Sequence, residues 1–423
     1  MENQGKNKEQ KSLTHSSFQK FYSALISINH FRLENNSFEN TSYLDNFFSE
    51  FRSITLVLQN NLPEGKNNPI YHEMNVKYFS TPEMKWFVNK RNQVIHKNPV
   101  SLMRLFRLEI YGISSIITKR TYFYDDEDHP QEDIQKAIRI ILDSLNAEVE
   151  VNFSVRHLII DKNSLEDMDM IDLIRKGIRT MWEFLNSVRN MLSDDSPPLQ
   201  RLDKEINKLL PEILNNEILF IIDYVYHVKE NKIIAATVGM VKFGLNIDRQ
   251  KLENITKTFR YMSINLDSNI DLYKWFIYYN IPLYGMGMKN LMSTFFIIYN
   301  DNSYSIQPFF SNLRSTAYRM INEVATMVEE GKVRAVVFMW EGIGYDITQA
   351  EELSKMTYED RKKLATSETV NIDLISKRTT RSIVFDPNRV NEKGYISNVM
   401  DLMQNKSIGL FLTPITKAFE ELE

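Results

Sequence analysis

The spacing of apolar residues changes from a helical to a strand-like period at about residue 100, and this change restricts the fold more than any other feature. Before it, apolar residues recur every three to four positions, as in an amphipathic α-helix. After it, apolar and polar residues alternate over 104–111 and 148–156, as in strands that bury one face. A chain that keeps both periods in separate segments is predicted to be α+β.

The first part of the predicted fold is a helical bundle. Four segments before the change have a helical period, and a long segment after the alternating stretches returns to it. These segments are residues 16–31, 41–59, 71–79, 81–98 and 164–192. Between 104 and 160, the two strands, a third candidate strand at 121–124 and a helix at 130–145 predict an α/β insertion within the bundle.

The second part is predicted to be an α+β domain that covers residues 214–423. Segments 218–228 and 232–243 favour buried strands, although short core helices would show the same pattern. The other elements expected are helices at 248–262 and 308–330, apolar segments at 275–282 and 294–299, and strands at 333–340, 382–385 and 408–412. The bundle and its insertion then occupy residues 15–213. Residues 1–14, rich in Asn, Gln and Lys, are expected to be a disordered tail.

The composition is that of an ordinary globular protein and narrows the classes of function. With 51 basic and 55 acidic residues, the charge is nearly balanced, so a nucleic-acid site has to come from a local basic patch. The chain has no Cys, which excludes disulfides and thiolate chemistry and fits a reducing cytoplasm. It shows neither a signal peptide nor an apolar run long enough to cross a membrane. A cytoplasmic protein that does not bind membranes is expected.

The helix predicted over residues 81–98 carries the side chains best suited to chemistry. The residues that cap, start and end it are Thr81, Pro82 and Pro99. Arg91 falls on the apolar face between Phe87 and Ile95, where a charge must be paired or point into a cleft. Asn92 and His96 are four residues apart and are therefore neighbours. One helix end thus gathers a fixed cation, an amide and a side chain that titrates near neutral pH.

A bundle whose fourth helix ends in Arg-Asn-x-x-x-His resembles the HEPN superfamily, which is defined by a helical bundle and an Arg-(four to six residues)-His motif. The resemblance covers about residues 15–100 and the returning helix near 164–193, and the α/β insertion departs from the minimal family fold. It implies metal-independent cleavage of RNA at a dimer interface, with Arg91, Asn92 and His96 as catalytic residues. It also implies a homodimer that needs no cofactor or metal. A toxin or antiviral (abortive-infection) effector with an antitoxin or sensor partner is the expected role.

The three residue types suit this chemistry. Attack by the RNA 2′-hydroxyl needs a group that takes and returns protons near neutral pH, as a His with a pKa of about 6.5 does. A planar Arg stabilises charge on the phosphorane, and Asn92 could hold the imidazole or contact the scissile phosphate. On one ideal helix, however, Arg91 and His96 diverge by about 140°. They converge only if the helix unwinds before Pro99 or if two subunits contribute, and we favour two subunits.

A structural interpretation of the same residues stands beside the catalytic one. Arg91 would pair with a carboxylate of the second helix, such as Glu50, and His96 would be stabilised by the dipole at the helix C-terminus. The protein would then be a non-catalytic HEPN-like module that dimerises and binds a partner. This interpretation predicts no RNA cleavage and a large loss of stability when Arg91 is removed.

Other basic residues are weaker candidates. Lys85, Lys90 and Lys97 flank the motif and are placed to hold RNA phosphates. The returning helix has a basic face that either binds RNA or is simply solvated. The residues of that face are Arg175, Lys176, Arg179 and Arg189.

The remaining polar motifs favour structure over chemistry. The acidic run 125–128 with His129 has metal-ligand residue types without a metal-site spacing and is interpreted as an exposed loop. Residues 341–344 are expected to form a tight turn, and no Walker-type loop is present, so neither NTP hydrolysis nor a metal is expected. The isolated histidines expected to be structural are His72, His157 and His227.

Overall fold

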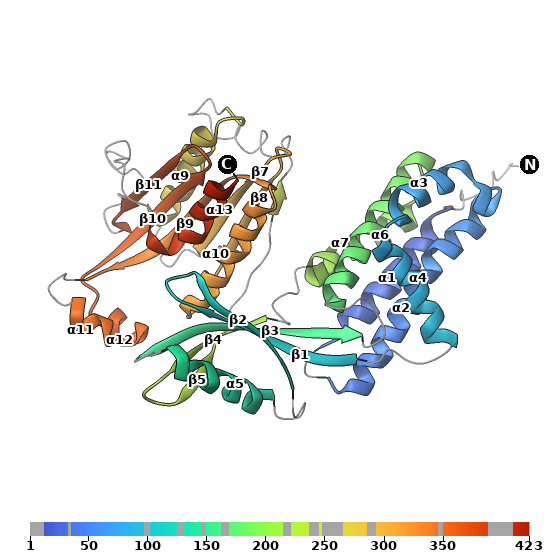
Figure 1. The fold of residues 1–423 in the computed structure, drawn as a ribbon. Helices are drawn as coiled ribbons and strands as arrows, with labels where there is room; N and C mark the ends of the chain where they lie inside the picture. Colours follow the sequence, from blue (N-terminus) through green and yellow to red (C-terminus); the bar gives the residue numbers. More distant parts are fainter. Residues whose placement is uncertain are drawn as a thin grey trace, which may run out of the picture. The chain divides into compact units, whose positions relative to one another are not determined.

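The computed structural model of the chain describes residues 12–32, 35–96, 102–124, 130–145, 149–161, 169–214, 221–236, 245–247, 265–285, 293–345, 350–387 and 409–422. They form two compact units (Figure 1). The first comprises Met1–Phe106, Tyr122–Glu127 and Arg156–Ile221, and the second comprises Arg107–Thr121, Asp128–Val155 and Ile222–Glu423. The predicted α+β class is confirmed, because both helices and antiparallel sheets are present.

The first unit contains the helical bundle. Its elements are α1 (His15–Asn29), α2 (Ser37–Asn61), the 3₁₀ turn η1 (Gly65–Asn67), α3 (Pro69–Phe79), α4 (Pro82–His96), α6 (Met170–Leu192) and α7 (Pro197–Leu214). Helix α7 was not predicted. Helix α6 ends at Leu192 with Ser193 in the left-handed conformation, and Pro197 and Pro198 then start α7, a position where proline is favoured. Asp169 caps α6 by accepting a hydrogen bond from the Ile171 amide at 3.1 Å. The predicted start of this helix at residue 164 lies outside the described residues.

The described chain begins at Ser12, within the segment expected to be disordered. The hydroxyls of Ser12 and Thr14 and the amide of Thr14 all donate to Oδ2 of Asp194, each at 2.8 Å. Thr14 is also fully buried. The predicted tail is therefore too long at its C-terminal end, since the chain is anchored from Ser12 onward. Residues 1–11 lie outside the described part.

Helices α4 and α6 approach closely at a glycine. Phe87 of α4 packs against Phe51 of α2, with ring centroids 4.8 Å apart. Its other side faces Gly177 of α6, where an added Cβ would lie 2.2 Å from Phe87 Cζ. No real side chain tolerates that distance, so the absence of a Cβ at Gly177 allows α4 to dock on α6.

Gly177→Ala is therefore expected to destabilise the bundle by about 1–3 kcal/mol, as overpacking of a close-packed core does. Alanine's higher helix propensity, about 0.5–1 kcal/mol, offsets only part of this cost. Urea unfolding measures the difference, with Lys176→Ala on the exposed side of the same helix as the control. Unchanged or higher stability of Gly177→Ala would show that α4 does not pack against α6 in this way.

The strands predicted within the insertion belong to a larger sheet. Its order is β2 (Ile116–Phe123), β1 (Leu102–Tyr111), β3 (Glu150–Asp161), β4 (Ile221–His227) and β5 (Lys232–Ala235). Helix α5 (Pro130–Leu145) lies between β2 and β3 in sequence, as expected. The predicted division therefore differs from the observed one, because most of the segment 104–160 clusters with the second unit. The reason is that β3 pairs with β4, a strand that follows the bundle in sequence.

The second sheet is antiparallel at each of its described pairings. Its strand order is β11 (Thr380–Phe385), β10 (Ser367–Ser376), β9 (Val333–Gly344), β7 (Ser293–Tyr299), β8 (Tyr304–Phe309) and β6 (Leu245–Ile247). The helices of this unit are α9 (Asn269–Gly285), α10 (Arg314–Glu329), α11 (Ala350–Ser354), α12 (Tyr358–Lys363) and α13 (Thr413–Glu421). Side chains alternate across the sheet, so that Phe296 packs with α9 and its neighbour Phe295 packs with α10 and α13. Each face thus has its own buried core.

The predicted start of a helix at 308 and the predicted strand at 408–412 are wrong. Pro308 pairs with Thr294 in strand β8, and α10 begins only at Arg314. Proline is tolerated near this end of β8 because β6 pairs only with residues 304–306, so no hydrogen bond to β6 is lost at position 308. Residues 410–412 form a 3₁₀ turn (η5, Leu410–Leu412) that leads into α13, not a strand. The helix expected at 248–262 lies outside the described residues.

A buried ion pair links helix α10 to strand β4 within the second unit. Arg319 of α10 binds Asp223 of β4 through two parallel hydrogen bonds, Nε to Oδ1 at 2.9 Å and Nη2 to Oδ2 at 3.0 Å. Its Nη1 donates to Glu323 at 2.8 Å, and Asp223 is only 2% exposed. Burial alone would lower the pKa of Arg319, but the charges of Asp223 and Glu323 raise that pKa well above its ordinary value. The group is therefore charged and fully paired.

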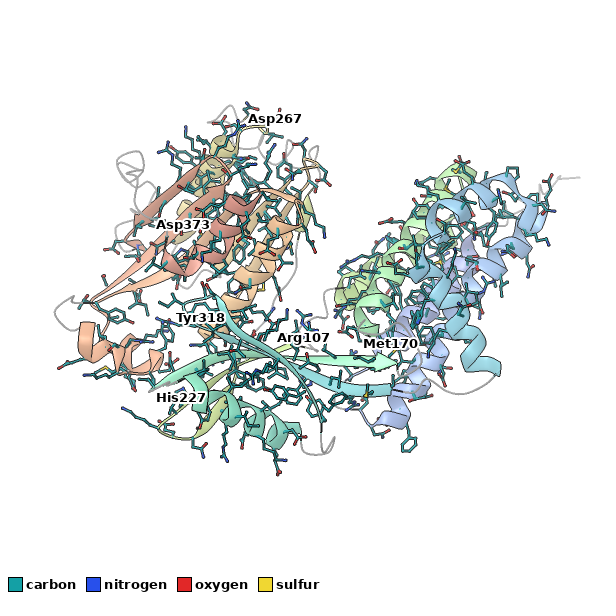
Figure 2. The ribbon with its side chains drawn as sticks, viewed as in Figure 1. Arg107, Met170, His227, Asp267, Tyr318 and Asp373 are labelled. Atoms are coloured by element: carbon teal, nitrogen blue, oxygen red, sulfur yellow. The ribbon has the colours of Figure 1, made fainter. Side chains whose placement is uncertain are left out.

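The described helices include none that is both long enough and apolar enough to cross a membrane. Side chains throughout the described part are shown in Figure 2.

Candidate functional site

Helix α4 carries the Arg-Asn-x-x-x-His motif, and its sequence explains where it starts. The Met84 amide donates to Thr81 Oγ1 at 3.3 Å, so Thr81 caps the helix as predicted. The side chains that α4 buries are Met84, Trp86, Phe87 and Lys90. Arg91, Asn92 and His96 lie in the last turns, where the backbone remains α-helical through His96. The side chains of these three residues, and the predicted end of the helix at Pro99, lie outside the described residues.

The three lysines predicted to hold RNA phosphates have different positions. Lys85 is exposed. Lys90 is only 2% exposed, so its prediction as a surface contact to RNA is wrong. It follows Phe87 by three residues and Trp86 by four, and so shares the face that packs into the bundle. Lys97 lies outside the described residues.

The carboxylate suggested as a partner for Arg91 is itself part of an ion pair. Glu50 of α2 pairs with Lys20 of α1 at 3.0 Å. Because the Arg91 side chain lies outside the described residues, the pairing of Arg91 stays a prediction.

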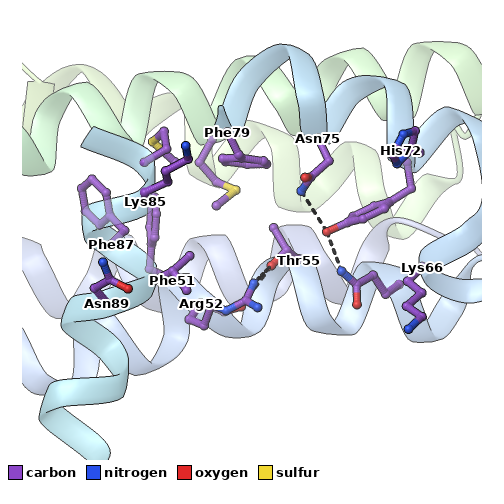
Figure 3. A pocket seen from close by; sticks show the side chains of 15 residues that line it. Phe51, Arg52, Thr55, Lys66, His72, Asn75, Phe79, Lys85, Phe87 and Asn89 are labelled. Atoms are coloured by element: carbon purple, nitrogen blue, oxygen red, sulfur yellow. Dashed lines mark hydrogen bonds between the residues drawn. The ribbon is translucent and has the colours of Figure 1, made fainter. Parts of the chain in front are cut away.

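A pocket of about 550 Å³ lies beside α4, enclosed mainly by α2, α3 and α4 (Figure 3). We call it the α2–α4 pocket. Its size is within the range of about 300–1,000 Å³ that is usual for ligand sites. Apolar side chains line part of its wall, including Phe51, Phe79 and Phe87. The polar side chains that line it are Arg52, Thr55, Gln59, Lys66, Tyr71, His72, Asn75, Lys85 and Asn89.

The charges of the α2–α4 pocket have one sign. Among the described residues that line it, Arg52, Lys66 and Lys85 are cations, and none is Asp or Glu. These cations form no ion pair with any carboxylate in the described part of the chain. Figure 3 shows Lys85 near one end of the pocket, Lys66 with His72 near the other, and Arg52 between them on α2. The pocket is therefore an unneutralised, positively charged site that would attract an anion.

A hydrogen-bonded group of neutral side chains forms part of the same wall. The hydroxyl of Tyr71 accepts hydrogen bonds from Gln59 Nε2 at 2.6 Å and from Asn75 Nδ2 at 3.1 Å. In this arrangement the phenol hydrogen is left to donate to another acceptor. Nearby, Arg52 Nη1 donates to Thr55 Oγ1 at 2.6 Å, which fixes the guanidinium against α2. The wall thus offers hydrogen-bond donors held by their neighbours, as well as exposed lysines.

Two of the four residues of the basic face predicted on α6 form ion pairs with carboxylates of the bundle. Arg175 is buried and pairs with Asp172 at 3.3 Å. Arg189 pairs with Asp195 at 2.7 Å and with Asp203 at 3.5 Å. Neither residue is available as a simple RNA contact, whereas Lys176 and Arg179 are exposed.

The other motifs contribute no described site. Residues 341–344 continue strand β9 instead of forming the predicted tight turn. An added Cβ at Gly342 would lie 2.7 Å from side-chain atoms of Thr369 and Asn371 on β10, so a larger residue there would displace these side chains. The acidic run 125–128 and His129 lie outside the described residues. Within the described ranges, no group of three or more His, Asp or Glu side chains could hold a metal ion.

Two buried titratable groups in the first unit have shifted pKa values. Burial, helped by the charge of Arg104, lowers the pKa of His157 to about 4. Its Nδ1 is 2.7 Å from the Tyr124 hydroxyl, which fits the structural role expected for this histidine. Burial and the nearby Asp172 raise the pKa of Asp169, the cap of α6, to about 6. Neither group lines the α2–α4 pocket.

Sequence reasoning missed most of the pocket, including Arg52, and interpreted His72 as structural although it is exposed in the pocket lining. These residues come from three helices and show no common motif; only Lys85 stood out, through its nearness to Arg91.

Comparisons with models of known protein families, with curated proteins and with solved structures find no match to this chain.

Proposed function

We propose that this protein is a metal-independent endoribonuclease of HEPN type, with Arg91, Asn92 and His96 as its catalytic residues. The observation that best supports the proposal is that α4, the helix with this motif, also forms a wall of a positively charged pocket whose described lining has no carboxylate. Asn89 of α4 lines the pocket and precedes Arg91 by two positions. A polyanion bound in the pocket would therefore lie near the helix end that has the motif.

The proposed reaction needs only the groups that the motif provides. The 2′-oxygen of one nucleotide attacks the adjacent phosphorus as His96 takes its proton, and the bond from phosphorus to the 5′-oxygen breaks. The departing 5′-oxygen receives a proton, which leaves a 2′,3′-cyclic phosphate and a 5′-hydroxyl. Arg91 stabilises the added charge on the phosphorane, and Asn92 orients the imidazole or the phosphate.

The continuous helix supports a site shared between two subunits. The α4 backbone is helical through His96, so unwinding before that residue does not bring Arg91 and His96 together. Their directions on one helix differ by about 140°. We therefore propose a homodimer in which Arg91 of one subunit and His96 of the other act on the same phosphate.

The biological role that fits this activity is that of a cytoplasmic toxin or antiviral effector. Uncontrolled RNA cleavage would damage the host cell, so such an enzyme needs a control element. We propose that the second unit, with its two sheets, provides the contact for an antitoxin or sensor partner.

Full-length protein is expected to cleave single-stranded RNA in buffer that contains EDTA, because neither the nucleophile nor the acid–base group requires a metal. The products should have 2′,3′-cyclic phosphate ends, identified by mass spectrometry. A substrate with 2′-deoxy nucleotides throughout serves as the control and should stay intact, since it lacks the nucleophile.

Cleavage that requires Mg²⁺, or that proceeds on the 2′-deoxy substrate, would contradict this mechanism. Absence of any RNA cleavage, together with a marked loss of stability in Arg91→Ala, would instead favour the non-catalytic, partner-binding alternative.

A further inference from the structure

We propose that the α2–α4 pocket binds a short single-stranded segment of RNA and makes the protein selective for single strands. This inference rests on the proposed function, since it assigns the substrate class of the same enzyme. It concerns residues outside the motif, chiefly Arg52, Lys66 and Lys85, whose positions the structure describes.

The distribution of charge fits a chain of phosphates better than a single anion. Phe51 and Gln59, both on α2, line the pocket and are eight residues apart, which corresponds to about 12 Å along the helix. Stacked nucleotides in one strand rise by about 3.4 Å each, so this length accommodates about three of them. Lys85 and Lys66 lie toward opposite ends, with Arg52 between them (Figure 3). Three separated cations thus follow the direction in which a strand would run.

The uncharged part of the lining fits bases. Phe79 is half-buried in the lining and provides aromatic surface, and stacking on such surface binds unpaired bases with little dependence on sequence. Phe51 and Phe87 are nearly fully buried and form the apolar floor beneath it. Asn75 and Asn89 provide amides that can bond to exposed base edges. A pocket for inorganic phosphate would have no need for this aromatic and amide wall.

The same wall explains why a duplex should be excluded. In double-stranded RNA the bases are stacked on one another inside the helix, and side chains reach mainly phosphates and 2′-hydroxyls. Bases in a duplex therefore cannot reach Phe79 and the two amides within a pocket of about 550 Å³. A single strand can turn its bases outward and contact the cations, the ring and the amides together.

Binding can be measured separately from cleavage with a fluorescent 2′-O-methyl oligonucleotide, which lacks the nucleophile. Anisotropy titrations would use full-length protein in EDTA and compare the single strand with a duplex of the same sequence. The test variants are Lys85→Gln, which alters only an exposed side chain, and the double variant Arg52→Gln/Lys85→Gln. The matched control is Lys204→Gln/Lys208→Gln on α7, which removes two exposed charges away from the pocket lining.

We expect Lys85→Gln to weaken single-strand binding several-fold and the double pocket variant to weaken it at least tenfold, with less than a twofold change in the control. The slope of log affinity against log salt should become shallower by about 1.4 in the double pocket variant, because two phosphate contacts are lost. The duplex should bind at least tenfold more weakly than the single strand.

Three results would overturn the inference. These are equal affinity in the pocket and control variants, equal affinity for duplex and single strand, and displacement of the oligonucleotide by AMP as effectively as by unlabelled oligonucleotide. The last result would identify a site for a free nucleotide. Failure of the proposed function would give a different result. The wild-type protein would then bind RNA without cutting it, and the pocket variants would still weaken that binding.

Discussion

His96→Ala is expected to lower the rate of RNA cleavage by about 10²- to 10⁴-fold, the usual contribution of a general acid–base group. Alanine can neither accept the proton of the 2′-hydroxyl nor return one to the leaving 5′-oxygen. Binding of the uncleavable oligonucleotide should remain close to that of the wild type, because the pocket cations are unchanged. The measurement is the single-turnover cleavage rate in EDTA, with His30→Ala as the matched control. His30 is exposed and stacks on Tyr43.

The His96→Ala variant, mixed with Arg91→Ala, also tests whether the two subunits of a dimer share each catalytic site. Arg91→Ala and His96→Ala should each be inactive alone, yet a mixture that exchanges subunits should regain part of the activity. One of the two sites in a mixed dimer then receives an intact Arg91 from one chain and an intact His96 from the other. Wild-type cleavage by His96→Ala would exclude this histidine from catalysis. No recovery in the mixture, despite demonstrated subunit exchange, would place both residues of a site in one chain.

Arg319→Leu is expected to destabilise the second unit by about 3–5 kcal/mol, the usual cost of removing one partner of a buried ion pair. The change would leave the Asp223 carboxylate, which is 2% exposed, without the two hydrogen bonds that it accepts from the guanidinium. Hydrogen–deuterium exchange gives the local readout, because peptides from β4 and α10 should exchange faster. Urea unfolding gives the overall loss of stability.

Two further variants control for this effect. Arg378→Leu changes an exposed arginine of the same unit and should leave stability nearly unchanged. The double variant Asp223→Leu/Arg319→Leu should recover much of the loss, because it removes both charges instead of isolating one. If Arg319→Leu proved as stable as Arg378→Leu, the packing of α10 against β4 would not depend on this ion pair.

Helices with a clear period and good terminal signals could be predicted closely from the sequence. The helix expected at 130–145 is α5, and Thr81 and Pro82 mark the start of α4. In these segments the local pattern and the tertiary packing agree, because the apolar stripe that forms the helix is the same one that it buries. Predictions failed where a proline fits two kinds of structure. Pro308 lies near the end of strand β8 instead of starting a helix, and Pro197 and Pro198 begin α7.

Burial of Lys90 and the membership of the pocket could not be predicted in the same way. Its spacing from Phe87 puts Lys90 on the packed face, but lysines are almost never fully buried, and only the packing of α4 on its neighbours encloses this one. Arg52, His72 and Lys85 come from three helices with no common spacing. Their convergence depends on how α2, α3 and α4 pack, and Gly177 has a part in that packing because it allows α4 to approach α6.

The sequence by itself determined the α+β class, the positions of the main helices and the place of Arg91, Asn92 and His96 at the end of α4, because each depends on spacing along one segment. Tertiary structure decided which strands share a sheet, since β3 pairs with β4 although helices α6 and α7 separate the two strands in sequence. It also decided that cations from separate helices line one pocket, whose described lining has no carboxylate. Such features depend on contacts between distant segments, and the period of a single segment does not encode them.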